Sequence, residues 1–277
     1  MPQNRAPLVA RLVARLVGQL GFGLDPNSLA NRDPALIASV LPVLRWFNAR
    51  YLQLSCSGVE HIPSGPVLFV ANHNGGIMGP DLFCTLGVLW QARGPAAPLY
   101  ALAHDFAMRQ LTPLGRQLAR VGAVRASREN ALRVLESGGS ALVYPGGDLD
   151  AYRHFSRRNE VVLAPRTGFI DVARRAGVPI VPIVAHGAHC SGIIFTEGEE
   201  LARRLGLRRW ARLERFPIAL ALPWIVAPGP WLPYLPLPLP ITLRILPPIS
   251  PTEGSDARDE ALLVQRRMQA ALDEMAA

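Results

Sequence analysis

Residues 66–81 read PVLFVANHNGGIMGPD, and this stretch decides the fold class. The run Val67–Ala71 is short and apolar throughout, which is typical of a strand covered on both faces of a sheet. Polar Asn72 and His73 follow it directly, and glycines come next. Asp81 then stands at the head of a predicted helix, Asp81–Gln91. The stretch therefore predicts a buried strand, a loop that carries polar side chains, and a helix.

The same alternation continues along the chain on both sides of this stretch. Besides Val67–Ala71, the predicted strands are Leu52–Ser57, Leu99–Leu102, Ala123–Arg125, Ala141–Tyr144, Ile180–Val184 and Ile241–Leu246. Besides Asp81–Gln91, the predicted helices are Met108–Val121, Arg128–Glu136, Gly168–Ala176, Glu197–Leu205 and Ala257–Ala276. Strands that alternate with helices indicate an α/β fold, a layered and mostly parallel sheet flanked by helices.

Composition excludes several classes of protein. The chain has 277 residues, of which 49% are hydrophobic and 18% charged, so it is not a disordered, charge-rich protein. Three cysteines are too few for a disulfide scaffold and indicate a reducing cytoplasm. The N-terminus lacks the apolar core and cleavage site of a signal peptide, so we expect none.

The charge is carried by arginine alone. The chain has 29 basic residues, none of them lysine, against 21 acidic residues, which gives a net charge of +8. Such a surface suits an anionic membrane or an anionic cofactor. The basic residues form no run and match no motif for reading bases, so we expect no nucleic acid as a partner.

The first fifty residues are predicted to form two helices. Residues 8–20 place leucines four apart on one face, with Arg11 and Arg15 on the other flank. A second helix is predicted from the N-cap Asp33 to about Arg50, kinked or split at Pro42. We interpret residues 1–50 as an amphipathic helical element that docks on a membrane, and residues 51–277 as the α/β domain. Packing of both helices on the protein's own core is the alternative.

A long uncharged segment lies near the end of the domain. Phe216–Leu243 has no charged residue over 28 positions, long enough to span a bilayer. Eight prolines within it break the hydrogen-bond ladder that a spanning helix needs. We therefore expect extended chain and loops, with Trp224, Trp231 and Tyr234 either at a lipid interface or capping the core.

Two stretches carry the residue types that chemistry needs. His73 follows a strand at the carboxyl edge of the sheet, where open α/β sheets bind ligands, and Asp81 could hold it as a general base. In the second stretch a strand leads into Tyr144-Pro145-Gly146-Gly147, and Asp148 and Asp150 follow. Glycines there allow close approach to the backbone, whose N–H groups could hold a phosphate or an oxyanion.

Four blocks in this order resemble the glycerolipid acyltransferases, the superfamily of lysophosphatidic acid and glycerol-3-phosphate acyltransferases. The blocks are NHNGGIMGPD (72–81), VGAVRASRENALRVL (121–135), LVYPGGDLDAYR (142–153) and AGVPIVPIVAHGAH (176–189). The resemblance extends from about Gly58 to Ile249. It implies a membrane-associated enzyme of glycerolipid and phospholipid synthesis that moves a fatty acyl group from acyl-CoA or acyl carrier protein to a lipid hydroxyl. It also implies that no metal or redox cofactor is needed. We expect the protein to be peripheral on the cytoplasmic face of the cell membrane, held there by residues 1–50 and the proline-rich segment.

The resemblance assigns roles to individual residues. His73 is implied to take the proton from the acceptor hydroxyl, and Asp81 to orient its ring. The implied substrate-binding residues are Asn72, Gly75, Gly76, Arg125, Arg128, Tyr144, Pro145, Gly146, Gly147, Asp148 and Pro182, with Pro182 closing the floor of the site.

This chain departs from the family pattern in two places. The family has four residues between the histidine and the aspartate, whereas seven separate His73 from Asp81 here. Asp105, Asp148 or Asp150 could therefore replace Asp81 as the orienting group. The third block reads Pro-Gly-Gly instead of Pro-Glu-Gly, so a neutral acceptor such as diacylglycerol or a fatty alcohol is an alternative to a glycerol phosphate.

Other classes remain as alternatives. A lipid hydrolase would need a Gly-x-Ser-x-Gly motif, which the sequence lacks. A non-catalytic lipid-binding protein on the same scaffold is a second alternative, because the aspartate is displaced. His186, His189 and Cys190 could suggest a metal, but we interpret them as lining of the pocket or as the entry to a helix.

Overall fold

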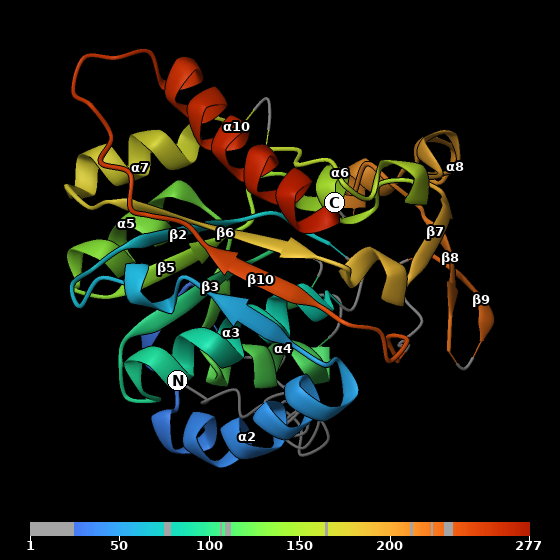
Figure 1. The fold of residues 1–277 in the computed structure, drawn as a ribbon, viewed down its shortest axis with the longest axis horizontal. Coiled ribbons are helices and arrows are strands. Elements are labelled where there is room, and N and C mark those ends of the chain that lie inside the picture. The colour runs from blue at the N-terminus through green and yellow to red at the C-terminus, as the bar shows by residue number, and fades with distance from the viewer. Residues whose placement is uncertain are drawn as a thin grey trace, which may run out of the picture.

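The computed structural model of the chain describes residues 25–74, 79–105, 107–108, 112–163, 166–210, 213–222, 224–229 and 235–277. Within these ranges a seven-stranded sheet lies between two layers of helices, and a three-stranded sheet stands beside it (Figure 1). The predicted helix at residues 8–20, and Trp231 and Tyr234 of the uncharged segment, lie outside the described residues.

The larger sheet confirms the predicted α/β class. Its strand order is β1-β10-β6-β2-β5-β3-β4. The bounds are β1 (Ser55–Ser57), β2 (Leu68–Ala71), β3 (Leu99–Ala103), β4 (Ala123–Arg125), β5 (Ser140–Val143), β6 (Ile180–His186) and β10 (Thr242–Ile245). Strands β4, β3, β5, β2 and β6 run parallel to one another, whereas β10 runs antiparallel to β6 and parallel to β1. All seven predicted strands therefore lie in one mostly parallel sheet.

Helices cover both faces of this sheet. The α-helices are α2 (Pro34–Trp46), α3 (Pro80–Arg93), α4 (Thr112–Arg120), α5 (Arg128–Glu136), α6 (Gly147–Ala151), α7 (Gly168–Ala176), α8 (Glu199–Arg204), α9 (Leu207–Trp210) and α10 (Ala257–Ala276). Short 3-10 or π-helical turns are η1 (Leu29–Asn31), η2 (Phe47–Tyr51), η3 (Val59–His61), η6 (Phe155–Arg157) and η7 (Ala188–Ser191). Helices α5, α7 and α10 pack on one face, and α3 with α2 on the other (Figure 1).

The central strand β2 shows why its sequence is apolar throughout. Leu68 and Val70 point into the core under α5, α7 and α10, while Phe69 and Ala71 point into the core under α3. Because side chains alternate along a strand, both faces need apolar residues when both are covered. The first polar residue, Asn72, marks the end of β2.

Helix α2 begins as predicted and does not break at Pro42. The Asp33 side chain accepts a hydrogen bond from the Leu36 N–H at 3.0 Å, and Pro34 opens the first turn. Pro42 cannot donate to the carbonyl of Ala38, but Ala38 is exposed, so water can solvate that carbonyl. The helix packs through buried Ile37, and its other flank exposes Val43 and Trp46. The domain boundary at residue 50 stays a prediction.

The smaller sheet was not predicted. It consists of β7 (Ile193–Thr196), β8 (Ile218–Ala221) and β9 (Ile225–Pro228) in an antiparallel arrangement. Two of these strands lie inside the uncharged segment, where the sequence indicated extended chain and loops. Among the described residues, none of the helices combines the length and the apolar character needed to cross a membrane.

Candidate active site

The candidate site lies at the carboxyl end of β2, beside β6. The Asn72 amide accepts a hydrogen bond from the Ala185 N–H at 2.8 Å and donates one to the Ala185 carbonyl at 3.1 Å. The Asn74 amide donates to the same carbonyl at 2.6 Å. Asn72 and Asn74 flank His73 in the sequence, and both are buried. Their hydrogen bonds therefore anchor the chain on either side of His73 to the end of β6. This is the sheet edge at which open α/β folds bind ligands.

His73 is paired with the predicted aspartate. Its ring Nδ1 lies 2.9 Å from Asp81 Oδ2; the Asp81 side chain is 0% exposed and that of His73 is 20% exposed. A hydrogen bond from Nδ1–H to the carboxylate leaves Nε2 with the lone pair that can take a proton. A buried carboxylate in this position orients the ring and stabilises an imidazolium.

The three additional residues before Asp81 are accommodated at the start of α3. Gly79 has a φ of +41°, in the left-handed region, and Pro80 opens the helix. A Cβ atom on Gly79 would lie 3.2 Å from His73 Cε1 and 3.4 Å from Asp81 Oδ1. Glycine at this position therefore lets the chain turn next to the ring and brings Asp81 within reach of it.

The three alternative aspartates have other partners. Asp105 pairs with Arg125 at 2.6 Å, and the Asp148 carboxylate accepts a hydrogen bond from the Glu214 N–H at 2.8 Å. Asp150 binds the backbone of His73 and not its ring. The geometry thus brings only Asp81, among the four candidates, to the His73 ring.

Tyr144 covers one face of the His73 ring. The two ring centroids are 4.3 Å apart with an interplanar angle of 29°. Burial, assisted by the negative charge of Asp81, raises the pKa of the Tyr144 hydroxyl well above its usual value. Tyr144 therefore stays neutral, and its stacking restricts the orientation of the imidazole.

A buried ion pair lies behind His73 and was missed in the sequence. Arg153 and Asp150 are both 0% exposed, and Arg153 Nη1 donates to Asp150 Oδ1. The same carboxylate accepts hydrogen bonds from the N–H groups of His73 and Val162. Arg153 also donates to the His73 carbonyl and to Asn74 Oδ1, each at 3.4 Å. The pair therefore fixes the backbone on both sides of the histidine.

The glycines of the third block permit close packing of the protein on itself. A Cβ atom on Gly146 would overlap the Val162 carbonyl oxygen and Asp150 Cβ. Gly147 has a φ of +55°, and a Cβ atom there would overlap the guanidinium of Arg166, which donates to the Pro145 carbonyl at 3.0 Å. Binding of substrate by this turn stays a prediction.

Substitution of Gly146 by alanine is expected to lower the free energy of unfolding by more than about 2 kcal/mol, because the methyl group has to displace backbone atoms. Gly65→Ala is the matched control, since a Cβ atom at Gly65 has nothing within 4 Å. Urea unfolding of both variants measures the difference. Equal stability of the two would show that the Gly146 turn can move without cost.

The remaining predicted binding residues are more dispersed. Arg125 is held by Asp105, and exposed Arg128 lies 3.7 Å from Asp171 at the start of α7. Pro182 lies opposite Val70 inside the sheet, three residues before Ala185, which is the β6 residue that contacts the site. Gly75 and Gly76 lie outside the described residues.

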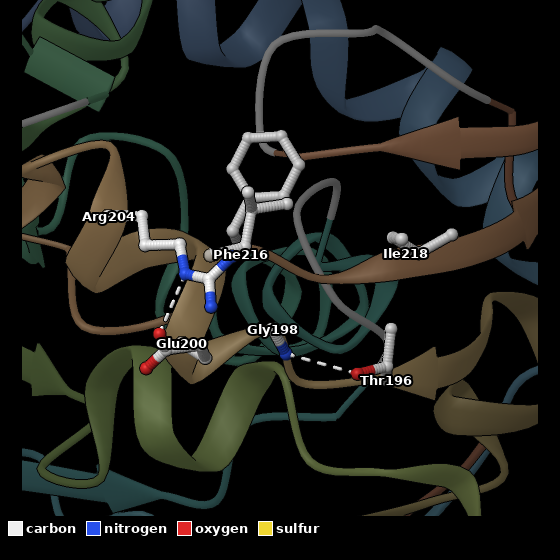
Figure 2. A pocket seen from close by; sticks show the side chains of 7 residues that line it. Thr196, Gly198, Glu200, Arg204, Phe216 and Ile218 are labelled. Carbon is white, nitrogen blue, oxygen red and sulfur yellow. Dashed lines mark hydrogen bonds and ion pairs between the residues drawn. The ribbon is translucent and has the colours of Figure 1, made fainter.

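A hollow of about 310 Å³ lies elsewhere, at the smaller sheet. Thr196 of β7, Arg204 of α8 and Phe216 are among the side chains around it, and an ion pair joins Arg204 to Glu200 (Figure 2). None of the predicted catalytic residues lines it. Among the described residues, no three His, Cys, Asp or Glu side chains are grouped so that they could hold a metal ion.

The comparisons with known proteins agree with this fold. A family model described as Acyltransferase matches residues 53–186. An uncharacterised protein of Mycobacterium tuberculosis is 31% identical over 239 residues, which are 83% of this chain and 64% of that protein. Diacylglycerol O-acyltransferase 1 of Eremothecium gossypii is 28% identical over 202 residues, 67% of this chain and 41% of that protein.

A solved structure shares the fold. The 1-acyl-sn-glycerophosphate acyltransferase PlsC of Thermotoga maritima matches with a TM-score of 0.54 and 17% identity, over 96% of this chain and 90% of that one. The layered sheet flanked by helices is thus a fold that this acyltransferase also has. By sequence over residues 53–186 and by fold, the chain is therefore similar to acyltransferases of glycerolipids. It spans slightly less than two thirds of the length of the mycobacterial relatives that it matches.

Proposed function

We propose that the protein transfers a fatty acyl group from acyl-CoA or acyl carrier protein to a lipid hydroxyl, with His73 as general base. The observation that carries this proposal is the 2.9 Å pair between His73 Nδ1 and the fully buried Asp81. His73 Nε2 takes the proton of the hydroxyl, the hydroxyl oxygen attacks the thioester carbonyl, and the thiol leaves. Asp81 stabilises the imidazolium, which returns its proton to the leaving thiolate. We expect these steps to need no metal or redox cofactor.

The nature of the acceptor is the finer part of the proposal. The first candidate is a lysophospholipid hydroxyl in glycerolipid and phospholipid synthesis, as in the name of the Thermotoga maritima protein. A neutral acceptor, diacylglycerol or a fatty alcohol, is the second candidate. Two observations favour it: the third block carries glycine where a carboxylate is usual, and Gly146 packs so closely that no larger side chain fits. Two fungal relatives bear the name diacylglycerol O-acyltransferase 1.

Release of free thiol from a long-chain acyl-CoA tests the reaction and the acceptor together. Lysophosphatidate, diacylglycerol and a fatty alcohol are offered in turn, and each is repeated with acylated carrier protein as donor. Release that depends on one acceptor supports acyl transfer and identifies the acceptor class. Binding of lipid without release for any donor and acceptor would support the lipid-binding alternative instead.

Membrane contact is a further part of the proposal, on the cytoplasmic face and without a spanning helix. Among the exposed large apolar side chains, two groups stand out: Val43 and Trp46 on α2, and Trp224, Ile225 and Val226 at the β8–β9 turn. A hollow of about 530 Å³ adjoins Trp46 between α2 and α3. Tryptophan and aliphatic side chains with arginine nearby suit the interface of an anionic bilayer.

The double substitution Trp224→Ser with Val226→Ser is expected to weaken binding to anionic phospholipid vesicles about tenfold or more, since each side chain buries apolar surface in the lipid. Co-sedimentation with vesicles measures it. Leu263→Ser on α10 is the control, because Leu263 is also exposed but lies on a different element. If high salt alone releases the wild type completely, the apolar contacts are minor.

A further inference from the structure

Among the residues that the structure describes, the buried histidine His189 has no hydrogen-bond partner. It lies on η7, just after β6, and is 1% exposed. Both of its ring nitrogens are buried and unpartnered within the described part of the chain. A neutral imidazole has one N–H to donate and one nitrogen lone pair to accept with, and more than about 90% of buried polar groups are hydrogen-bonded. Two unpartnered atoms on one buried ring therefore require an explanation.

The position of His189 connects it to the candidate site. Strand β6 contributes Ala185, which binds Asn72 and Asn74, and η7 begins three residues later. The η7 turn packs against α3, the helix that carries Asp81. Within the turn, the Ser191 hydroxyl donates to the Ala188 carbonyl at 2.6 Å, and the Leu237 N–H donates to the Ser191 carbonyl at 2.8 Å. The ring is thus on a fixed turn at the same sheet edge as His73.

The charges around His189 define what it can bind. Burial, together with the positive charge of Arg153, lowers the pKa of His189 well below its usual value, so the ring is neutral. A neutral N–H in an electropositive, water-poor site favours an oxygen that carries partial or full negative charge. Ester, thioester and hydroxyl oxygens of the reacting lipids have this character.

We infer that His189 donates a hydrogen bond to an oxygen of a substrate bound beside His73, as a second polar residue of the acyl-transfer site. This inference rests on the proposed function. The free protein carries the unfavourable energy of an unsatisfied ring, and the bound substrate removes it. The oxygen belongs either to the acyl donor or to the lipid acceptor.

Substitution of His189 by phenylalanine separates this role from a structural one. Removing an unsatisfied polar group from the interior does not destabilise a protein, whereas removing a partnered one does. We expect the melting temperature of His189→Phe without ligand to equal or exceed that of the wild type, while kcat/KM falls by roughly 10- to 100-fold. His189→Gln keeps an N–H donor and should recover part of the activity. His189→Leu repeats the test with a smaller apolar side chain.

Asn130→Leu is the control for stability. Asn130 is also buried, but its amide donates to Asn27 Oδ1 at 2.9 Å and to the Arg125 carbonyl at 2.8 Å, so its loss should lower the melting temperature. If the melting temperatures of His189→Phe and His189→Leu fall as far as that of Asn130→Leu, the inference is wrong. Unchanged kcat/KM in these variants would overturn it as well.

Ligand-induced shifts of the melting temperature identify the source of the oxygen. Wild type and His189→Phe are each heated with palmitoyl-CoA alone and with dioleoylglycerol or lysophosphatidate alone. The ligand that raises the melting temperature of the wild type but not of His189→Phe is the substrate that carries the oxygen. Equal shifts in both proteins contradict the inference. A wild type that transfers no acyl group refutes the proposed function, whereas the melting temperatures and ligand shifts still report on His189.

Discussion

Substitution of His73 by alanine is expected to reduce kcat for acyl transfer by roughly 100- to 10,000-fold, the range found when a positioned general base is removed. The reason is local: the pair with Asp81 orients the imidazole at the carboxyl end of β2. Asp81→Asn should lower the rate less, because the ring keeps Tyr144 against one face and its backbone anchors on both sides.

His61→Ala is the matched control for this experiment. The His61 ring bonds the Ile245 carbonyl at 2.8 Å, next to β10 and away from the carboxyl end of β2. The substitution His61→Ala should therefore leave kcat unchanged. Thiol release is measured on variants whose melting temperatures match that of the wild type. Equal kcat for wild type and His73→Ala would refute the proposed mechanism, whatever the acceptor.

Arg153→Met should produce the largest loss of stability, about 3 to 5 kcal/mol in the free energy of unfolding. The substitution leaves the carboxylate of Asp150 buried with backbone N–H donors and without its cation. Burial already lowers the pKa of Arg153 to about 10, and the residue remains charged at neutral pH. Since Asp150 also accepts from the His73 N–H, the remaining folded protein should be less active as well.

An exposed ion pair provides the comparison for Arg153. Arg203 pairs with Glu200 at 2.6 Å, but the Arg203 side chain is 77% exposed. Arg203→Met is expected to change the free energy of unfolding by about 1 kcal/mol or less. Urea unfolding of the two variants at the same pH measures both values. A loss for Arg153→Met no larger than that for Arg203→Met would show that the Asp150 carboxylate finds another partner.

Most of the larger sheet could be predicted from the sequence because burial on both faces leaves a direct signal. Strands such as β2 and β6 are apolar at consecutive positions, and α5, α7 and α10 were predicted with their observed bounds. The smaller sheet could not be predicted, since two of its strands, β8 and β9, lie among prolines that also fit loops. Ile225 at the start of β9 has a φ of +62°, a backbone conformation that a β-branched residue rarely adopts and no sequence pattern indicates.

The candidate site was predictable to the extent that it depends on residues of one block. His73 and Asp81 lie eight positions apart in the sequence. Their side chains meet because Gly79 adopts a left-handed conformation, which the sequence alone does not reveal. Arg153 and Asp150 were harder to recognise, because the burial of an arginine depends on elements far away in the sequence. Their spacing of three on a predicted turn was the signal available. The isolation of His189 follows from packing alone.

Strand β10 has a consequence for the way the chain is made. It lies between β1 and β6, so residues 242–245 separate the first strand of the sheet from all the others. While the ribosome synthesises the preceding two hundred and more residues, β1 has no neighbour and β6, beside His73, keeps an open edge. Unpaired edges of apolar strands invite association with other chains. A nascent chain stalled before residue 242 should therefore depend on chaperones more strongly than one stalled a few residues after β10.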